Sequence, residues 1–277
     1  MFSKISKDNP VICWWSGGIT SAVACYICIM LFGIENCRII FIDTKNEDPD
    51  TYRFKKDCEK WYGKEIETIT NEKYNNIEEV WDKYQSLNVA HGAICSTELK
   101  REVRLKFQKE NNYAFQSHGF DIGEPKRALA MTLNYSDSNP FYPLLFMGWT
   151  KKYCFVILKQ ADIEPPNAYK LGYKNNNCLK TKCVQGGIGY WQMVKREDYP
   201  AFLKMAQIEH KYTDAKGFPV TMLKDQSKGG GLVFLLPHPD YPNVKDISIM
   251  KGREPKPMIE CNGYCGINDL IQNPNNQ

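Results

Sequence analysis

Small and hydroxyl-bearing residues gather in the string SGGITS, which runs from Ser16 to Ser21. Gly17 and Gly18 let a ligand approach the main chain closely, because glycine carries no side chain. If a helix begins directly after this turn, its unpaired N–H groups and the positive end of its dipole point at one spot. That spot suits a phosphate, with Ser16, Thr20 and Ser21 as further donors. An ordinary strand-to-helix turn is the alternative, since the string matches neither G-x-x-x-x-G-K-[ST] nor G-x-G-x-x-G.

The eleven cysteines are the second group of residues that could do chemistry. Two close pairs stand apart from the rest, Cys178 with Cys183 and Cys261 with Cys265. Four thiolates are the number that a tetrahedral zinc site or a four-iron cluster takes. Disulfides and unrelated free thiols are the alternatives. Cys95 lies in the polar string GAICSTELKRE. The others lie singly in apolar stretches and are predicted to be small buried hydrophobic residues: Cys13, Cys25, Cys28, Cys37, Cys58 and Cys154.

The elements that would position these residues alternate between strands and helices. Apolar, β-branched stretches predict strands at 11–15, 38–42, 64–69 and 113–117. Helical patterns begin near Ala22, at Pro49, at Glu98 and near Thr150, which can cap its helix. This alternation predicts an α/β fold, a parallel sheet with helices on both faces. Ligands of such sheets lie beyond the carboxyl ends of the strands, where SGGITS and Asp43-Thr44 would meet.

Composition sets limits on the class of protein. The chain has 277 residues, 43% of them hydrophobic and 25% charged, which is ordinary for a globular protein that buries a large core. The net charge of +4 permits an anionic ligand but is weaker than the basic footprint of most nucleic-acid-binding domains. The longest apolar run, within 22–34, is too short to span a bilayer, and the N-terminus lacks the pattern of a signal peptide. We therefore expect a cytoplasmic protein without membrane contact.

Five segments in order resemble the phosphoadenosine phosphosulfate (PAPS) reductase-like branch of the PP-loop, or adenine nucleotide alpha hydrolase, superfamily. They are SGGITSA, FIDTKNEDPDTYRF, ICSTELKREV, GFDIGEPKRA and LGYKNNNCLKTKCVQGGIGYWQ, and they lie within residues 11–205. The resemblance implies a Rossmann-like PP-loop fold that binds ATP or a related adenine nucleotide, together with Mg²⁺. It implies the following roles: Ser16, Gly17, Gly18, Thr20 and Ser21 on the phosphates, Asp43 and Thr44 beside the adenine or ribose, and Lys100, Glu124, Lys126 and Arg127 on the phosphate or acceptor side.

Three departures from the family pattern bear on the substrate. Asp121 stands where the G-I-R segment usually has arginine, and Asp43 and Lys45 replace an asparagine and a glycine of the second-strand motif. The E-C-G-L-H-like tail that supplies the catalytic cysteine of assimilatory reductases is absent, and ECNGYCGIND stands in its place. An intact SGG turn is more typical of the members that cleave ATP between its α and β phosphates.

The resulting prediction is an enzyme that adenylates an acceptor and releases pyrophosphate, for sulfur or nitrogen transfer to a small molecule or a nucleic acid. A thiol-dependent sulfonucleotide reductase is the first alternative, and a nucleotide-sensing or nucleic-acid-binding module without turnover is the second. Residues 1–165 are predicted to form the PP-loop domain, and residues 166–277 a smaller region held by Zn²⁺ or a [4Fe–4S] cluster on Cys178, Cys183, Cys261 and Cys265. Lys100 is open between a phosphate-facing role and a solvated surface, and a homo-oligomer is also left open.

Overall fold

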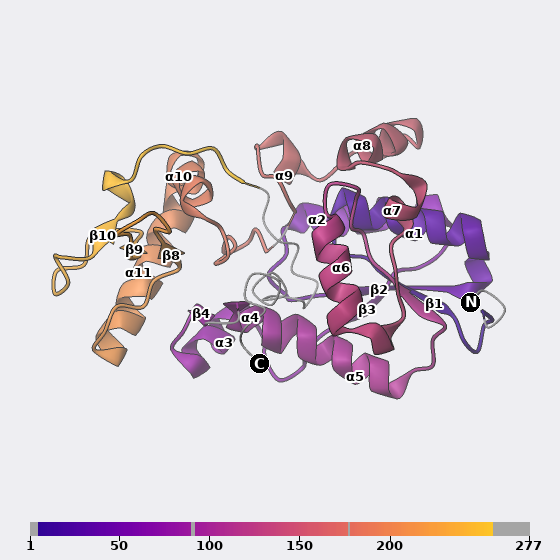
Figure 1. The fold of residues 1–277 in the computed structure, drawn as a ribbon, viewed down its shortest axis with the longest axis horizontal. Coiled ribbons are helices and arrows are strands. Elements are labelled where there is room, and N and C mark those ends of the chain that lie inside the picture. The colour runs from indigo at the N-terminus through magenta and orange to yellow at the C-terminus, as the bar shows by residue number, and fades with distance from the viewer. Residues whose placement is uncertain (1–4, 90–91, 177, 257–277) are drawn as a thin grey trace.

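The computed structural model describes residues 5–89, 92–176 and 178–256 (Figure 1). Its centre is a five-stranded sheet in the order β3-β2-β1-β6-β7, in which every neighbouring pair is parallel. The predicted α/β fold with a parallel sheet is therefore confirmed. The strands are β1 (Val11–Trp14), β2 (Cys37–Ile42), β3 (Glu67–Ile69), β6 (Phe115–Ser117) and β7 (Pro140–Phe141).

Helices cover both faces of this sheet because its central strand is apolar on both sides. Successive side chains of a strand point to opposite faces. Val11 and Cys13 accordingly enter the core that contains helix α1, whereas Ile12 and Trp14 pack with Phe107 on the other face. The cysteines predicted to be buried hydrophobic residues are confirmed as such, with at most 1% exposure. The first core is formed with α1 (Ile19–Phe32), α2 (Pro49–Tyr62), α7 (Pro143–Met147) and α8 (Lys151–Gln160), and the other face is covered by α5 (Glu102–Glu110).

The helix boundaries follow local capping chemistry. Helix α1 begins at Ile19, three residues before the predicted start, directly after Gly18. The Thr150 hydroxyl accepts a hydrogen bond from the N–H of Tyr153 and caps α8, as predicted. The predicted helix at 98–110 differs, because it opens with a π-helical turn at Thr97–Arg101 before α5. π-Helical turns are rare in proteins overall, but those that occur are frequently found at functional sites.

A second core lies at the other end of the long axis of the molecule (Figure 1). It combines C-terminal residues such as Trp191 and Phe202 with Trp81 and Leu87 from the middle of the chain. The division predicted at residue 165 stays a prediction, and this core draws on both sides of it. The helices and strands in and next to this part of the chain are α3 (Ile77–Tyr84), β4 (Asn88–Val89), β5 (Gly92–Ala93), α4 (Ile94–Ser96), α9 (Asn167–Lys170), α10 (Ile188–Glu197), α11 (Tyr199–Lys216), β8 (Leu223–Lys224), β9 (Leu232–Phe234) and β10 (Lys245–Asp246). Across the described ranges, every helix is too short or too polar to cross a membrane.

Candidate functional site

The turn between β1 and α1 is built by its own hydroxyl groups. The Ser21 side chain accepts hydrogen bonds from the main-chain N–H and the hydroxyl of Ser16, both at 3.0 Å, and donates to the Gly18 carbonyl at 2.8 Å. Gly17 has a φ of +83°, a conformation that glycine adopts without strain. Within the described part of the chain, the N–H groups of Gly17 and Gly18 donate to no residue. The turn therefore presents free donors at a helix N-terminus, the arrangement that binds phosphate.

The turn also lies where the strand order reverses. Strand β1 has β2 on one side and β6 on the other, and crevices at such switch points hold the ligands of α/β sheets. Gly119 follows β6 and packs directly on the start of α1. A Cβ atom at Gly119 would lie 2.7 Å from the main-chain nitrogen of Ser21, so no larger residue fits there. The two backbones therefore approach each other closely at this switch point.

The side chains of the loop after β2 are held by hydrogen bonds. The hydroxyl of Tyr52 donates to both oxygens of Asp43, at 3.0 and 2.9 Å, and the Lys45 N–H donates to one of them at 2.7 Å. The Thr44 hydroxyl donates to Glu47 at 2.9 Å. Both residues predicted to contact the adenine or ribose thus occupy single, supported orientations.

The segment that carries Cys178 and Cys183 packs against this loop. Glu47 accepts the Cys178 N–H at 3.4 Å, and the Asn46 amide donates to the Cys178 carbonyl at 3.4 Å and to the Thr181 hydroxyl at 2.8 Å. The region around the two cysteines is therefore a neighbour of the loop after β2, although it lies more than 130 residues later in the sequence.

One small, partly open cavity brings together residues from three parts of the chain. Thr44, Cys95, Lys100, Cys178 and Cys183 all line it. Lys100 is only 8% exposed, so the solvated-surface alternative for this residue is wrong. Cys95, which the sequence places in a polar string, is equally buried and lies with the two paired cysteines. Lys100 lies in the π-helical turn at Thr97–Arg101.

Burial raises the pKa of both Cys178 and Cys183. Loss of solvent raises the pKa of Cys178 to about 11, an effect that Lys100 opposes and Glu47 reinforces. The pKa of Cys183 rises well above its ordinary value for the same main reason, with the neighbouring Cys178 and Cys95 adding to it. Burial also raises the pKa of Glu47, against the attraction of Lys100. A metal ion bound here would have to displace these protons, since the thiolate is the ligand form.

The described cysteines do not form a ready-made metal site. Cys178 and Cys183 are free thiols, while Cys261 and Cys265 lie outside the described residues. In a tetrahedral zinc site, Zn–S bonds of about 2.3 Å place the sulfurs roughly 3.8 Å apart. Cys95, Cys178 and Cys183 do not reach such spacing, because the one described group of three or more metal-binding side chains within 4.8 Å lies elsewhere. The three thiols have the softness that zinc and iron–sulfur clusters prefer, without a preformed zinc geometry.

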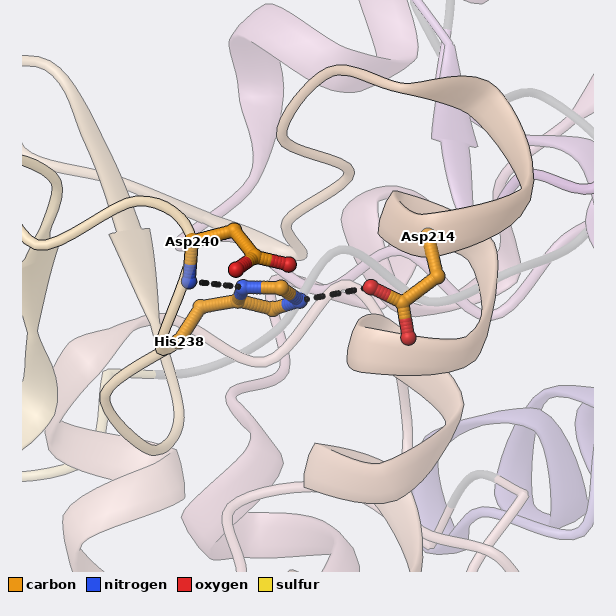
Figure 2. Close-up of side chains that lie close together, drawn as sticks. All are labelled: Asp214, His238 and Asp240. Atoms are coloured by element: carbon orange, nitrogen blue, oxygen red, sulfur yellow. Dashed lines mark hydrogen bonds and ion pairs between the residues drawn. The ribbon is translucent and has the colours of Figure 1, made fainter.

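That other group is Asp214, His238 and Asp240, at the far end of α11 (Figure 2). The main-chain N–H of Asp240 donates to Nδ1 of His238 at 3.2 Å, which leaves the proton of a neutral ring on Nε2. Nε2 lies 3.1 Å from Asp214 and donates to it. Since metal-bound histidines usually donate from their second nitrogen, this tautomer offers no free lone pair to a cation. The group holds α11 to the loop after β9.

Glu124 and Arg127 form an ion pair with each other at the start of α6 (Pro125–Asn134), and the Arg127 guanidinium lies 4.5 Å from the centre of the Phe120 ring. Lys126 is exposed on the same turn.

Asp121, which replaces the arginine expected from the family pattern, has a structural role. Its oxygens accept the N–H groups of Gly123 at 2.8 Å and Lys151 at 2.5 Å. It thereby joins the loop after β6 to the start of α8.

Apart from Asp43 and the two cysteines outside the described residues, the predicted site residues fall into three groups. The turn contains Ser16, Gly17, Gly18, Thr20 and Ser21, the cavity contains Thr44, Lys100, Cys178 and Cys183, and the start of α6 contains Glu124, Lys126 and Arg127. Sequence reasoning assigned no role to Glu47, Tyr52 and Asn176. Glu47 ends the second-strand motif and Asn176 belongs to the NNNC string. Both residues could therefore be recognised as parts of family motifs, but the sequence alone did not indicate what their side chains do.

Comparisons with known proteins bear on the same region. A family model described as phosphoadenosine phosphosulfate reductase domain matches residues 10–180. The crystal structure of phosphoadenylyl-sulfate (PAPS) reductase from Candida auris, in a phosphate complex, is similar with 18% sequence identity and a TM-score of 0.44, covering 59% of this chain and 78% of that one. No curated protein matches the sequence. The family match runs from β1 to the Cys178 segment and confirms the resemblance drawn from the five motifs.

Proposed function

Because the chain belongs to the phosphoadenosine phosphosulfate reductase domain family, we propose that it is an enzyme that binds an adenine nucleotide and adenylates an acceptor with release of pyrophosphate. The observation that carries the proposal is the turn at the start of α1, where the N–H groups of Gly17 and Gly18 have no partner among described residues. ATP is the substrate, with Mg²⁺ bound to its phosphates, and the activated acceptor receives sulfur or nitrogen.

The chemistry asks the protein to position charge rather than to form covalent bonds. Adenylation transfers AMP to the acceptor while pyrophosphate leaves, and preorganised donors stabilise the negative charge that develops on the phosphates. In this proposal the turn from Ser16 to Ser21 holds the phosphates, and Asp43 and Thr44 orient the adenosine. Arg127 and Lys126 neutralise the charge on the phosphates, and the planar, two-pronged guanidinium of Arg127 suits it to this role. Lys100 serves the acceptor side from the cavity.

A thiol-dependent sulfonucleotide reductase is the second candidate. Three thiols in a cavity that Thr44 also lines favour it, because a reductase needs a cysteine beside the nucleotide. The competent nucleophile is the thiolate, however, and burial raises the pKa of both Cys178 and Cys183 further above neutral pH, which disfavours these two thiols as the nucleophile.

We further propose that any metal ion or iron–sulfur cluster of this protein uses Cys95 together with Cys178 and Cys183. The three side chains line one cavity, and soft thiolates are the preferred ligands of zinc and of clusters. In this proposal the fourth thiolate comes from Cys261 or Cys265, the second pair in the four-cysteine hypothesis. A bound zinc ion would stabilise the surrounding fold, whereas a cluster would supply redox chemistry.

The decisive experiment measures two products from the same purified protein. Pyrophosphate release from ATP is assayed across candidate acceptors, and sulfite release is assayed from PAPS with a dithiol reductant. We expect pyrophosphate, with Cys95→Ser retaining the rate within about tenfold, or ~1.4 kcal/mol of barrier. Arg127→Ala should lose considerably more, because charge stabilisation is lost in the transition state. Sulfite release that Cys95→Ser abolishes, with a covalent adduct on Cys95 of the unaltered protein, would establish the reductase instead.

A further inference from the structure

The side chain of Asn176 reaches the phosphate turn from a distant part of the sequence. Its amide nitrogen donates to the Gly17 carbonyl at 2.9 Å and to the Thr51 hydroxyl at 3.0 Å. Asn176 is 2% exposed, so these hydrogen bonds form away from water. It stands two residues before Cys178, in the segment packed against the loop after β2.

The hydrogen bond from Asn176 to the Gly17 carbonyl determines the direction of the neighbouring Gly18 N–H. A peptide bond is planar and trans, so the carbonyl of one residue and the N–H of the next point in opposite directions. Because Asn176 holds the Gly17 carbonyl on its own side, the Gly18 N–H points away from Asn176. That N–H donates to no described residue. Without the Asn176 amide, the Gly17–Gly18 peptide could rotate and turn this donor elsewhere.

Thr51 supports the same arrangement from the first turn of α2. Its hydroxyl accepts from Asn176, and its methyl carbon would lie 2.9 Å from a Cβ atom placed on Gly17. The glycine is therefore packed tightly on the side where Asn176 approaches. The turn, α2 and the Cys178 segment meet at this one peptide group.

We propose that Asn176 is a positioning residue, which fixes the Gly17–Gly18 peptide so that the Gly18 N–H faces the phosphate of the bound nucleotide. The inference rests on the proposed function, because it requires a nucleotide phosphate at this turn. It assigns to the NNNC string a role in nucleotide binding that is separate from the cysteine beside it.

The test compares affinities for ATP and for adenosine, which lacks phosphate, by isothermal titration calorimetry. Asn176→Ala is expected to weaken ATP binding at least tenfold and to leave adenosine binding within twofold. Asn176→Asp is the second variant, since its carboxylate repels the Gly17 carbonyl and should weaken ATP binding further at similar side-chain size. Asn36→Ala is the matched control: this asparagine also donates to a main-chain carbonyl, that of Phe32 at 2.8 Å, at the opposite end of α1.

A second readout follows the donor itself. In the unaltered protein, ATP should slow hydrogen exchange of the Gly18 amide, and this protection should be lost in Asn176→Ala. Equal ATP affinity in the unaltered protein and both Asn176 variants would overturn the inference and leave the proposed function standing. An equal loss of ATP and adenosine binding would also overturn it, because the role would then be general support of the fold. Absence of ATP and PAPS binding to the unaltered protein would refute the proposed function itself, and the inference with it.

Discussion

The Thr44 hydroxyl donates a hydrogen bond to the buried carboxylate of Glu47, at 2.9 Å. The same carboxylate accepts the Cys178 N–H, and the positive charge of Lys100 acts on it. Glu47 thus connects the predicted adenosine loop, the cysteine segment and the π-helical turn. Three regions that are separate in the sequence share one buried carboxyl group.

The first prediction concerns this carboxyl group. Glu47→Gln keeps an oxygen for Thr44 but removes the acidic group that interacts with Lys100, so we expect a loss of roughly 1–3 kcal/mol in unfolding free energy. Lys100→Met should also destabilise the protein. The double variant should lose less than the sum of the two single losses, by at least about 0.5 kcal/mol, as expected for residues that interact. Urea denaturation of all four proteins measures this coupling, and strict additivity would contradict it.

The second prediction concerns Gly17. An alanine there would hold an L-residue at a φ of +83° and place its Cβ atom 2.9 Å from the Thr51 methyl carbon. We expect Gly17→Ala to cost about 1–2 kcal/mol of stability, from the unfavourable backbone conformation, and to weaken ATP binding more than tenfold. Gly231→Ala is the control, since a Cβ atom at Gly231 meets no atom within 4 Å. Titration calorimetry gives the affinities, and unchanged ATP binding by a folded Gly17→Ala protein would refute the phosphate site at this turn.

The third prediction concerns the thiols. Protein purified anaerobically without chelator should contain zinc or iron, and serine at Cys95, Cys178 or Cys183 should lower the metal content by more than half. Cys154→Ser is the control, because Cys154 is equally buried but belongs to the first core. Elemental analysis and the visible absorption spectrum separate zinc from a cluster. Metal-free unaltered protein, or loss of metal from Cys154→Ser alone, would contradict the proposed ligands.

The fourth prediction concerns Glu209 on α11, whose oxygens accept the N–H groups of Met222 at 2.7 Å and Leu235 at 2.8 Å. Burial raises its pKa to about 8, although the two hydrogen bonds act to lower it. The folded protein therefore binds this proton more tightly than the unfolded chain, where glutamate has a pKa of about 4.3. Its stabilising effect is fully present below that lower value and is lost as the pH rises towards 8.

We accordingly expect the unfolding free energy of the unaltered protein to fall relative to Glu209→Gln between pH 5 and pH 8, by up to about 1.4 kcal/mol per pH unit. Denaturation at three pH values within this range measures the slope. Glu65→Gln is the control, because Glu65 is exposed. A difference between the unaltered protein and Glu209→Gln that does not change with pH would refute the assignment.

The sheet and the position of the turn between β1 and α1 could be predicted because their signals are local. Continuous apolar runs such as VICW and IIFI mark strands that are covered on both faces, and the SGG turn lies between strand and helix. Thr150 and its hydrogen bond to the N–H of Tyr153 show the same locality, because a cap acts within one helical turn.

The cavity could be predicted only in part because burial depends on contacts between distant segments. Lys100 lies in the charged string ELKREVRLK, which is also typical of a solvated helix, and it is covered by residues near Cys178. Asn176 likewise acts on a carbonyl 159 residues away. Contacts between such distant segments leave no periodic pattern in the sequence. Lys100 and Asn176 could therefore be recognised only as members of family motifs.

The interleaving of the two cores has a consequence for synthesis on the ribosome. Trp81 and Leu87 leave the ribosome early, but the residues that cover them, such as Trp191 and Phe202, follow about a hundred residues later. At synthesis rates of roughly 5–20 residues per second, these apolar side chains stay uncovered for several seconds after the parallel sheet is complete. The nascent chain in this interval is the form most exposed to aggregation and to chaperone binding, and substitutions that weaken α10 or α11 should lower the yield of protein before they affect the nucleotide turn.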